Sequence, residues 1–153
     1  MRRLMIHAVL SATLAVALSP ALAQSPAVKV DDAWVRATVS QQRSTGAFMQ
    51  MTAEKPLKIV AVSSPLTPMV EIHEMKMEDG VMKMRAVDVL PLPAGQLVEL
   101  KPGGFHVMLM GLKAPVKVGE TVPLTFTLED AAGQRSKLEV QARGRAGLPR
   151  AMQ

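Results

Sequence analysis

Short runs that alternate between apolar and polar residues, separated by glycine and proline, constrain the fold of this chain more than any other feature. Successive side chains of a strand point to opposite faces, so a period of two predicts half-buried strands. No window sustains the 3.6-residue period of a long helix. Several short strands at this spacing predict an all-β fold, an antiparallel β-sandwich or barrel. The predicted strands are 28–39, 46–53, 57–63, 70–77, 81–90, 97–100, 105–112, 121–129 and 135–142.

One hairpin is predicted residue by residue. Asp79-Gly80 lies between two alternating runs, and Asp-Gly favours a two-residue turn because both turn positions take positive φ. That turn pairs Met75 with Met84 across the hairpin and puts both side chains on one face. The predicted register places His73, Met75, Met77, Met82 and Met84 on this face, and Glu74, Lys76, Lys83 and Arg85 on the other.

The apolar face of the first strand of this hairpin changes near His73. Val70 and Ile72 have the parity of Glu74, so they point away from the methionine face. A β-bulge near His73 would explain the change, and so would a strand that crosses from one environment into another. The sequence leaves both explanations open.

Methionine is frequent and cysteine is absent, with 12 Met and 0 Cys among 153 residues. The absence of cysteine excludes disulfides, thiolate metal sites, cysteine nucleophiles and blue-copper centres, which need a Cys thiolate. Thioether and imidazole ligands together suit copper, and thioether particularly suits the cuprous ion. Zinc would favour thiolate or carboxylate beside imidazole. The alternative is that the hairpin methionines are simply core-filling side chains on an inward face.

Two histidines follow the N-terminal segment, and each begins a His-x-Met triplet. These are His73-Glu74-Met75 and His106-Val107-Met108. Residues i and i+2 of a strand point the same way, so each triplet can present a nitrogen and a sulfur to one point. The coincidence of two such triplets favours a metal site, although a lone histidine is more often a surface or hydrogen-bonded residue.

Four of these residues follow the spacing H-x10-M-x21-H-x-M, namely His73, Met84, His106 and Met108. With its flanking residues, this pattern resembles the periplasmic Cu(I) chaperones called PCu(A)C, over about residues 28–141. The resemblance implies a cupredoxin-like Greek-key β-sandwich of antiparallel strands, and one Cu(I) per chain held by the four residues. Whether Met75 joins or replaces a ligand stays open. The flanking segments that carry the resemblance are 33–36, 71–75, 80–85 and 103–109.

The resemblance also implies a function. A member of this family carries copper to the assembly pathway of the CuA centre of cytochrome c oxidase, or to another copper-accepting protein of the periplasm. The alternative is a periplasmic protein that stores copper or confers resistance without a dedicated client. Some relatives carry a His/Met-rich C-terminal extension, but this tail has only Met152, so no second copper site is expected in it.

Residues 1–23 have the features of a cleaved signal peptide. Arg2 and Arg3 precede a mostly apolar run from Leu4 to Leu18, and 21–23 reads Ala-Leu-Ala, a small-x-small cleavage signal. The run is too short and too interrupted for a membrane span. We expect export to the periplasm with no stable membrane insertion after cleavage. The predicted domains are therefore a signal peptide (1–23), a copper-binding domain (24–141) and a flexible basic tail (142–153).

The remaining composition argues against other classes of function. The net charge of +5 is not accompanied by interleaved basic and aromatic residues, so nucleic-acid binding is not expected. The sequence has no Gly-x-Ser-x-Gly motif, no Walker motif and no obvious catalytic pair of carboxylates, so the chain is not expected to be an enzyme. We expect a monomer whose partner is a periplasmic copper-accepting protein or an oxidase subunit.

Overall fold

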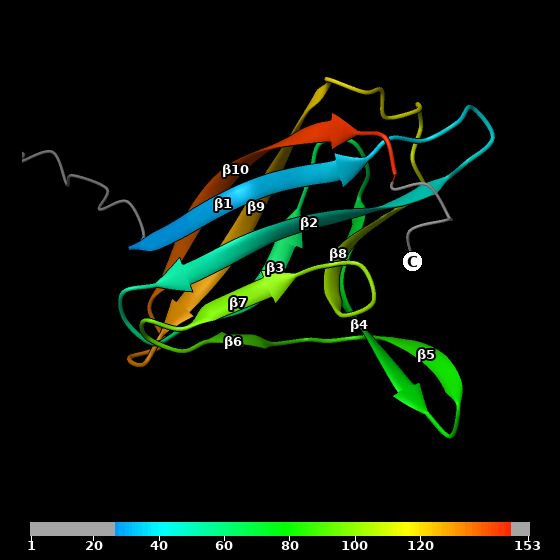
Figure 1. Cartoon of the computed structure of the whole chain (residues 1–153). Coiled ribbons are helices and arrows are strands. Elements are labelled where there is room, and N and C mark those ends of the chain that lie inside the picture. The colour runs from blue at the N-terminus through cyan, green and yellow to red at the C-terminus, as the bar shows by residue number, and fades with distance from the viewer. Residues whose placement is uncertain (1–26, 148–153) are drawn as a thin grey trace, which may run out of the picture.

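The computed structural model describes residues 27–147, which form an all-β domain (Figure 1). The predicted signal peptide and residues 148–153 of the predicted tail lie outside the described residues. Residues 27–147 contain no helix, and hence none that could cross a membrane. The strands are β1 (Val28–Arg36), β2 (Ser44–Ala53), β3 (Leu57–Ser63), β4 (Met69–Glu78), β5 (Val81–Ala86), β6 (Leu90–Leu92), β7 (Leu97–Leu100), β8 (Phe105–Met110), β9 (Thr121–Asp130) and β10 (Arg135–Arg145).

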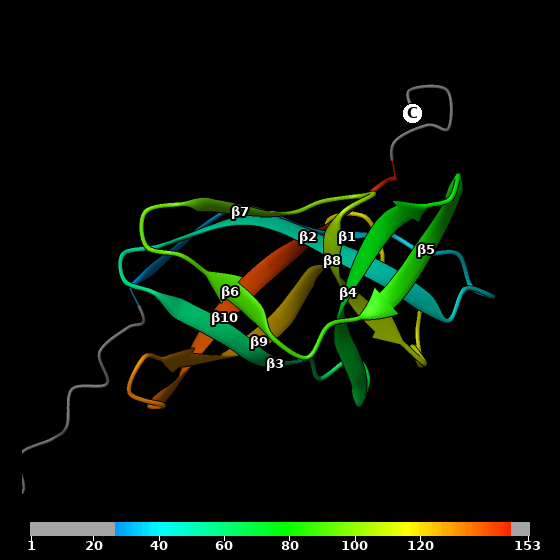
Figure 2. The ribbon, with the colours of Figure 1, turned by 90° about the horizontal axis from the view of Figure 1, so that it is seen from below.

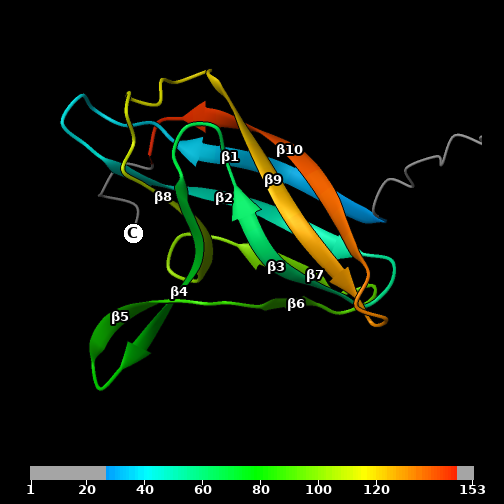
Figure 3. The same ribbon diagram turned by 180° about the vertical axis from the view of Figure 1, so that it is seen from behind.

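The strands form one curled sheet in the order β5-β4-β8-β7-β2-β1-β10-β9-β3-β6. The sheet folds over so that β9 and β3 lie behind β1 and β2 (Figures 1 and 3), which confirms the predicted all-β sandwich. Most strand pairs are antiparallel, as predicted, and two pairs are parallel, namely β1 with β10 and β7 with β8. The first and last strands are joined by the whole domain, so no tight hairpin fixes their relative direction.

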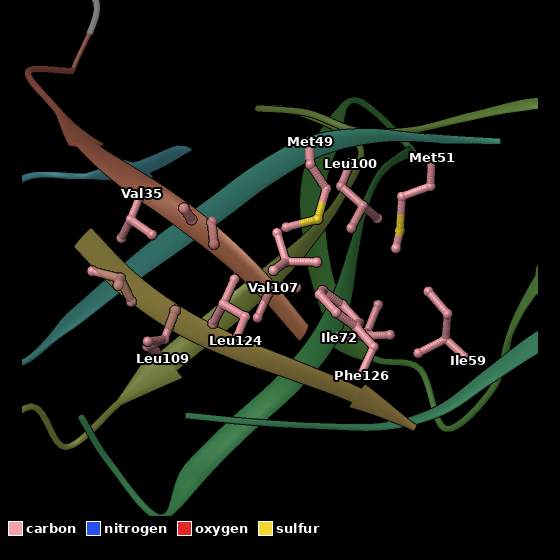
Figure 4. Close-up of a cluster of buried hydrophobic side chains, with 14 of the residues drawn as sticks. Val35, Met49, Met51, Ile59, Ile72, Leu100, Val107, Leu109, Leu124 and Phe126 are labelled. Atoms are coloured by element: carbon pink, nitrogen blue, oxygen red, sulfur yellow. The ribbon is translucent and has the colours of Figure 1, made fainter. Parts of the chain in front are cut away.

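The hydrophobic core lies between the two halves of the curled sheet. Phe126 from β9 is its largest fully buried side chain, and Met51 from β2 is also fully buried. Met51 fills the core as the general behaviour of methionine predicts. Figure 4 shows members of this cluster, among them Val35, Met49, Ile59, Ile72, Leu100, Val107, Leu109 and Leu124.

The predicted β4–β5 hairpin is confirmed in turn and register. Asp79 and Gly80 have φ angles of 52° and 75°, as a type I′ turn requires. Met75 pairs with Met84, Met77 with Met82 and His73 with Ala86.

The change of apolar face near His73 reflects a change of environment along β4. The pairings of β4 show no register shift, so no bulge is present. Ile72 is buried in the core, whereas Met77 near the other end of the strand is exposed. The outer half of β4 runs with β5 beyond the sandwich (Figures 1 and 3), so the second of the two explanations holds.

Several predicted boundaries differ from the structure, and two of these differences change the description of the domain. The predicted strand 81–90 divides, because β5 ends at Ala86 and the chain then crosses to β6, where Leu90 and Leu92 are buried and pair with β3. At the other end of the domain, β10 continues to Arg145, four residues into the predicted tail, and Ala142 is fully buried.

Candidate metal centre

Three neighbouring strands carry the four residues predicted as ligands. His73 lies on β4, Met84 on β5, and His106 and Met108 on β8. Since β4 lies between β5 and β8 (Figure 2), the hairpin and the distant β8 become parts of one surface. His73 pairs directly with His106, and their ring centroids lie 5.9 Å apart. Residues separated widely in sequence therefore meet on one face of the sheet.

An open hollow of about 850 Å³ lies on this face. Met84, His106 and Met108 line it, whereas His73 does not line it and instead packs against the His106 ring. The hollow has a thioether side and a polar side. Its other lining residues are Met75 and Met82, then Arg36, Gln42, Ser44, Thr45, Gly46, Phe48, Lys101, Pro102 and Gly103.

His106 is held in one tautomer by the turn that precedes β8. Its side chain is buried, and Nδ1 lies 3.1 Å from the carbonyl oxygen of Gly104. A carbonyl only accepts, so Nδ1 donates the hydrogen bond and the lone pair remains on Nε2. Burial lowers the pKa of His106, and His73 and Arg36 lower it further, against the raising effect of the Gly104 hydrogen bond. The ring is therefore neutral at neutral pH, as a metal ligand must be.

His73 is held in the opposite tautomer by a carboxylate. Its Nε2 lies 2.8 Å from Oε2 of Glu71, two residues earlier on the same face. The carboxylate accepts, so Nε2 donates and the lone pair is on Nδ1. Nδ1 is buried and has no hydrogen-bond partner within residues 27–147. A buried nitrogen without a partner is costly unless something binds it, and a metal ion would supply that interaction.

Phe48 of β2 packs beside the His106 ring, and Trp34 packs beside Phe48. The Phe48 ring lies 6.2 Å from His106 and 4.5 Å from Trp34, with the Arg36 guanidinium 5.7 Å from its centroid. Phe48 can lie over its own strand because position 46 is glycine, where a Cβ would come within 2.8 Å of the ring. The motif did not identify Phe48. Phe48 alternates with Met49 and Met51 along β2, so its side chain points to the opposite face of the strand, and this alternation was the signal that could have found it.

The hairpin methionines are not core residues. Met77, Met82 and Met84 are 58%, 43% and 49% exposed, so the alternative that they fill an inward face is wrong. Within residues 27–147 no group of three or more His, Asp or Glu side chains could hold a metal ion. The Glu71 carboxylate on this face bonds His73. The four predicted ligands themselves are imidazole nitrogens and thioether sulfurs, a set that suits a soft ion.

Sequence comparisons identify relatives over most of the domain. The family model described as "Putative lipoprotein LpqE-like" matches residues 28–141. "Putative lipoprotein Lxx21020" of Leifsonia xyli subsp. xyli is 33% identical over 74% of this chain and 72% of that protein. An uncharacterized protein of Rickettsia prowazekii is 32% identical over 63% of this chain and 57% of that protein.

Solved structures share the fold. The solution structure of apo-DR1885 from Deinococcus radiodurans is 35% identical, covers 97% of this chain and 98% of that one, and gives a TM-score of 0.61. The solution structure of CuI-DR1885 is 32% identical over 84% and 85% of the two chains, with a TM-score of 0.52. The copper-bound PCuAC domain from PmoF2, at 23% identity, covers 80% of this chain and 96% of that one at a TM-score of 0.63. That last likeness concerns the fold alone.

Proposed function

The chain belongs to the LpqE-like family, and from this premise we propose that it is an exported, periplasmic carrier that binds one Cu(I) tightly and delivers it to a copper-accepting protein. Export is supported by the N-terminal sequence and by the lipoprotein names of its relatives. Copper as cargo is supported by the solved Cu(I) form of a protein 32% identical to this chain. The acceptor belongs to the assembly pathway of the CuA centre or is another periplasmic copper protein.

The ligands in this proposal are Nδ1 of His73, Nε2 of His106 and the sulfur atoms of Met84 and Met108. The observation that carries it is the pairing of two adjacent imidazoles whose other nitrogens are occupied by Glu71 and Gly104. Each ring is left with one free lone pair. His106 lines a hollow together with thioethers, and His73 packs against the His106 ring.

The chemistry of this donor set explains a preference for Cu(I). All four ligands are neutral, so the loaded site keeps the single positive charge of the ion, and thioethers bind without losing a proton. Thioethers are favoured by the cuprous ion over harder cations. They also form no disulfides in an oxidising compartment, as thiol ligands would.

The graded burial of the ligands suits release to a partner. His106 is buried and Met108 is half-buried, whereas Met84 lies on the exposed hairpin. A ligand from an acceptor protein would reach the ion from the Met84 side and replace the thioethers before the histidines. Exchange one ligand at a time keeps copper bound throughout the transfer.

The proposal is tested by anaerobic Cu(I) titration against a competing chelator, followed by X-ray absorption. We expect one tightly bound Cu(I) per chain, with two nitrogen and two sulfur neighbours. Transfer to an apo CuA domain would separate a carrier from a storage protein, which would keep its copper. A protein that leaves the chelator fully loaded would refute the proposal.

Glu71 provides a second test, because it fixes the tautomer of His73. Carboxylates that hydrogen-bond to a metal-binding histidine contribute about 10- to 100-fold to metal affinity. Glu71 is half-exposed, so we expect Glu71→Ala to lower the Cu(I) affinity by about tenfold. Glu74→Ala is the matched control, because Glu74 lies on the opposite face and bonds Arg85. Equal losses of affinity in both variants would contradict the role of Glu71.

A further inference from the structure

We propose that the outer end of the β4–β5 hairpin holds a second, weaker Cu(I) site, formed by the thioethers of Met77, Met82 and Met75. This site would load the ion before it passes to the site described above. The inference rests on the proposed function, because it takes Cu(I) as the cargo.

The strand register brings these thioethers close together. The backbone N–H of Val87 donates to the carbonyl of Ile72, which makes 72 and 87 a hydrogen-bonded pair. Pairs alternate along an antiparallel ladder, so Met75–Met84 and Met77–Met82 are both non-hydrogen-bonded pairs. At such pairs the Cα atoms are about 4.5 Å apart and the side chains approach most closely. Two successive pairs on one face thus form a patch of four flexible thioethers.

Packing does not explain why this patch is apolar. Met77 and Met82 remain exposed within the domain, so they add little burial. The hairpin is instead supported from its opposite face, where Arg85 bonds Glu74 at 2.8 Å and Lys83 pairs with Glu78 at 3.1 Å. The methionine face is therefore free to serve another purpose.

The donors on this face select a soft ion. The paired positions 75, 77, 82 and 84 are all methionine, and the carboxylates of Glu74 and Glu78 belong to the opposite face by parity. Hard cations need oxygen ligands, whereas thioethers suit Cu(I). With no imidazole in the patch, binding should be weaker than at the histidine site.

The patch leads directly to the histidine site. Met75, Met82 and Met84 line the same hollow as His106 and Met108. An ion held by Met75, Met77 and Met82 can form a bond to Met84 as it leaves Met77. It then forms a bond to His106 as it leaves Met82. A bond to Met108 forms as the ion leaves Met75, before His73 completes the site. Each exchange forms one copper–ligand bond and breaks another. Copper stays Cu(I), and no electron or proton is transferred, because every ligand is neutral.

The test is the double variant Met77→Leu, Met82→Leu, compared with the wild type under anaerobic Cu(I) titration. Native mass spectrometry counts the bound ions, and NMR of ¹³C-methyl methionine shows which thioethers bind. We expect the wild type to bind one tight and one weaker Cu(I), with the second equivalent shifting the Met77 and Met82 methyl signals. The variant should lose the weaker ion and keep the tight one with unchanged affinity.

Met69→Leu is the matched control, because Met69 is equally exposed on β4 but lies at the strand's other end. It should keep both ions. A second equivalent that persists in the double variant, or that leaves the Met77 and Met82 signals unmoved, would overturn the inference. A failure of the proposed function looks different, since the wild type would then bind no tight Cu(I) at all.

Discussion

Replacing both Met84 and Met108 by leucine should lower the affinity for Cu(I) by about a hundredfold or more. Substituting a residue that hydrogen-bonds to a metal ligand already lowers metal affinity by about 10- to 100-fold. This variant removes two of the four proposed ligands themselves. Leucine keeps the volume and apolar character of methionine, so the fold should be preserved within about 1.5 kcal/mol. The exposure of Met84 reduces that cost further. Chelator competition measures the affinity, and circular dichroism checks the fold.

The control for this variant is the same chemical change elsewhere in the domain. Met49 and Met51 are buried core residues on the inward face of β2. Their double substitution by leucine should leave Cu(I) affinity unchanged, even if stability falls slightly. An X-ray absorption spectrum of the Met84→Leu, Met108→Leu variant should lose its sulfur signal from the tight site. Affinity equal to that of the wild type would remove both thioethers from the proposed ligand set.

Local signals in the sequence predicted the hairpin and its register. Asp79-Gly80 specifies a two-residue turn, and a two-residue turn fixes every pair that follows it, including Met75 with Met84. The turn and the register needed only neighbours along the chain. The position of the hairpin outside the core was not predicted, because the opposite parities of Ile72 and Met77 fitted a bulge as well as a change of environment.

The arrangement of the candidate site depended on pairing between distant segments. Nothing local determines that His73 faces His106, because β4 and β8 are separated by β5, β6 and β7. The spacing of the motif suggested the four residues only through its resemblance to a family. The contact of Phe48 with His106 emerges only when the sheet is assembled. Glu71 and Gly104, in contrast, lie only two residues from the histidines that they contact.

The C-terminal strand also depends on contacts between segments that are distant in sequence, and these contacts lead to a stability prediction. The glycines, proline and arginines of residues 142–153 suggested a flexible tail, yet Gly144 pairs closely with the segment before β9. Its N–H donates to the carbonyl of Glu120 at 2.7 Å, and its carbonyl accepts from Gly119 at 2.8 Å. A Cβ at position 144 would lie 2.1 Å from the Lys117 carbonyl oxygen. Only glycine fits there.

Gly144→Ala should therefore lower the free energy of unfolding of the metal-free protein by about 3 kcal/mol, at the upper end for overpacking. The contact is with backbone that is itself held by hydrogen bonds, so relief requires breaking some of them. Gly104→Ala is the matched control, since its Cβ would make only ordinary contacts with Lys101, at 3.5 Å to the side chain and 3.8 Å to the carbonyl oxygen. That change should alter stability by less than about 1 kcal/mol. Urea unfolding compares the two variants, and a wild-type midpoint for Gly144→Ala would mean that the end of β10 is a free tail after all.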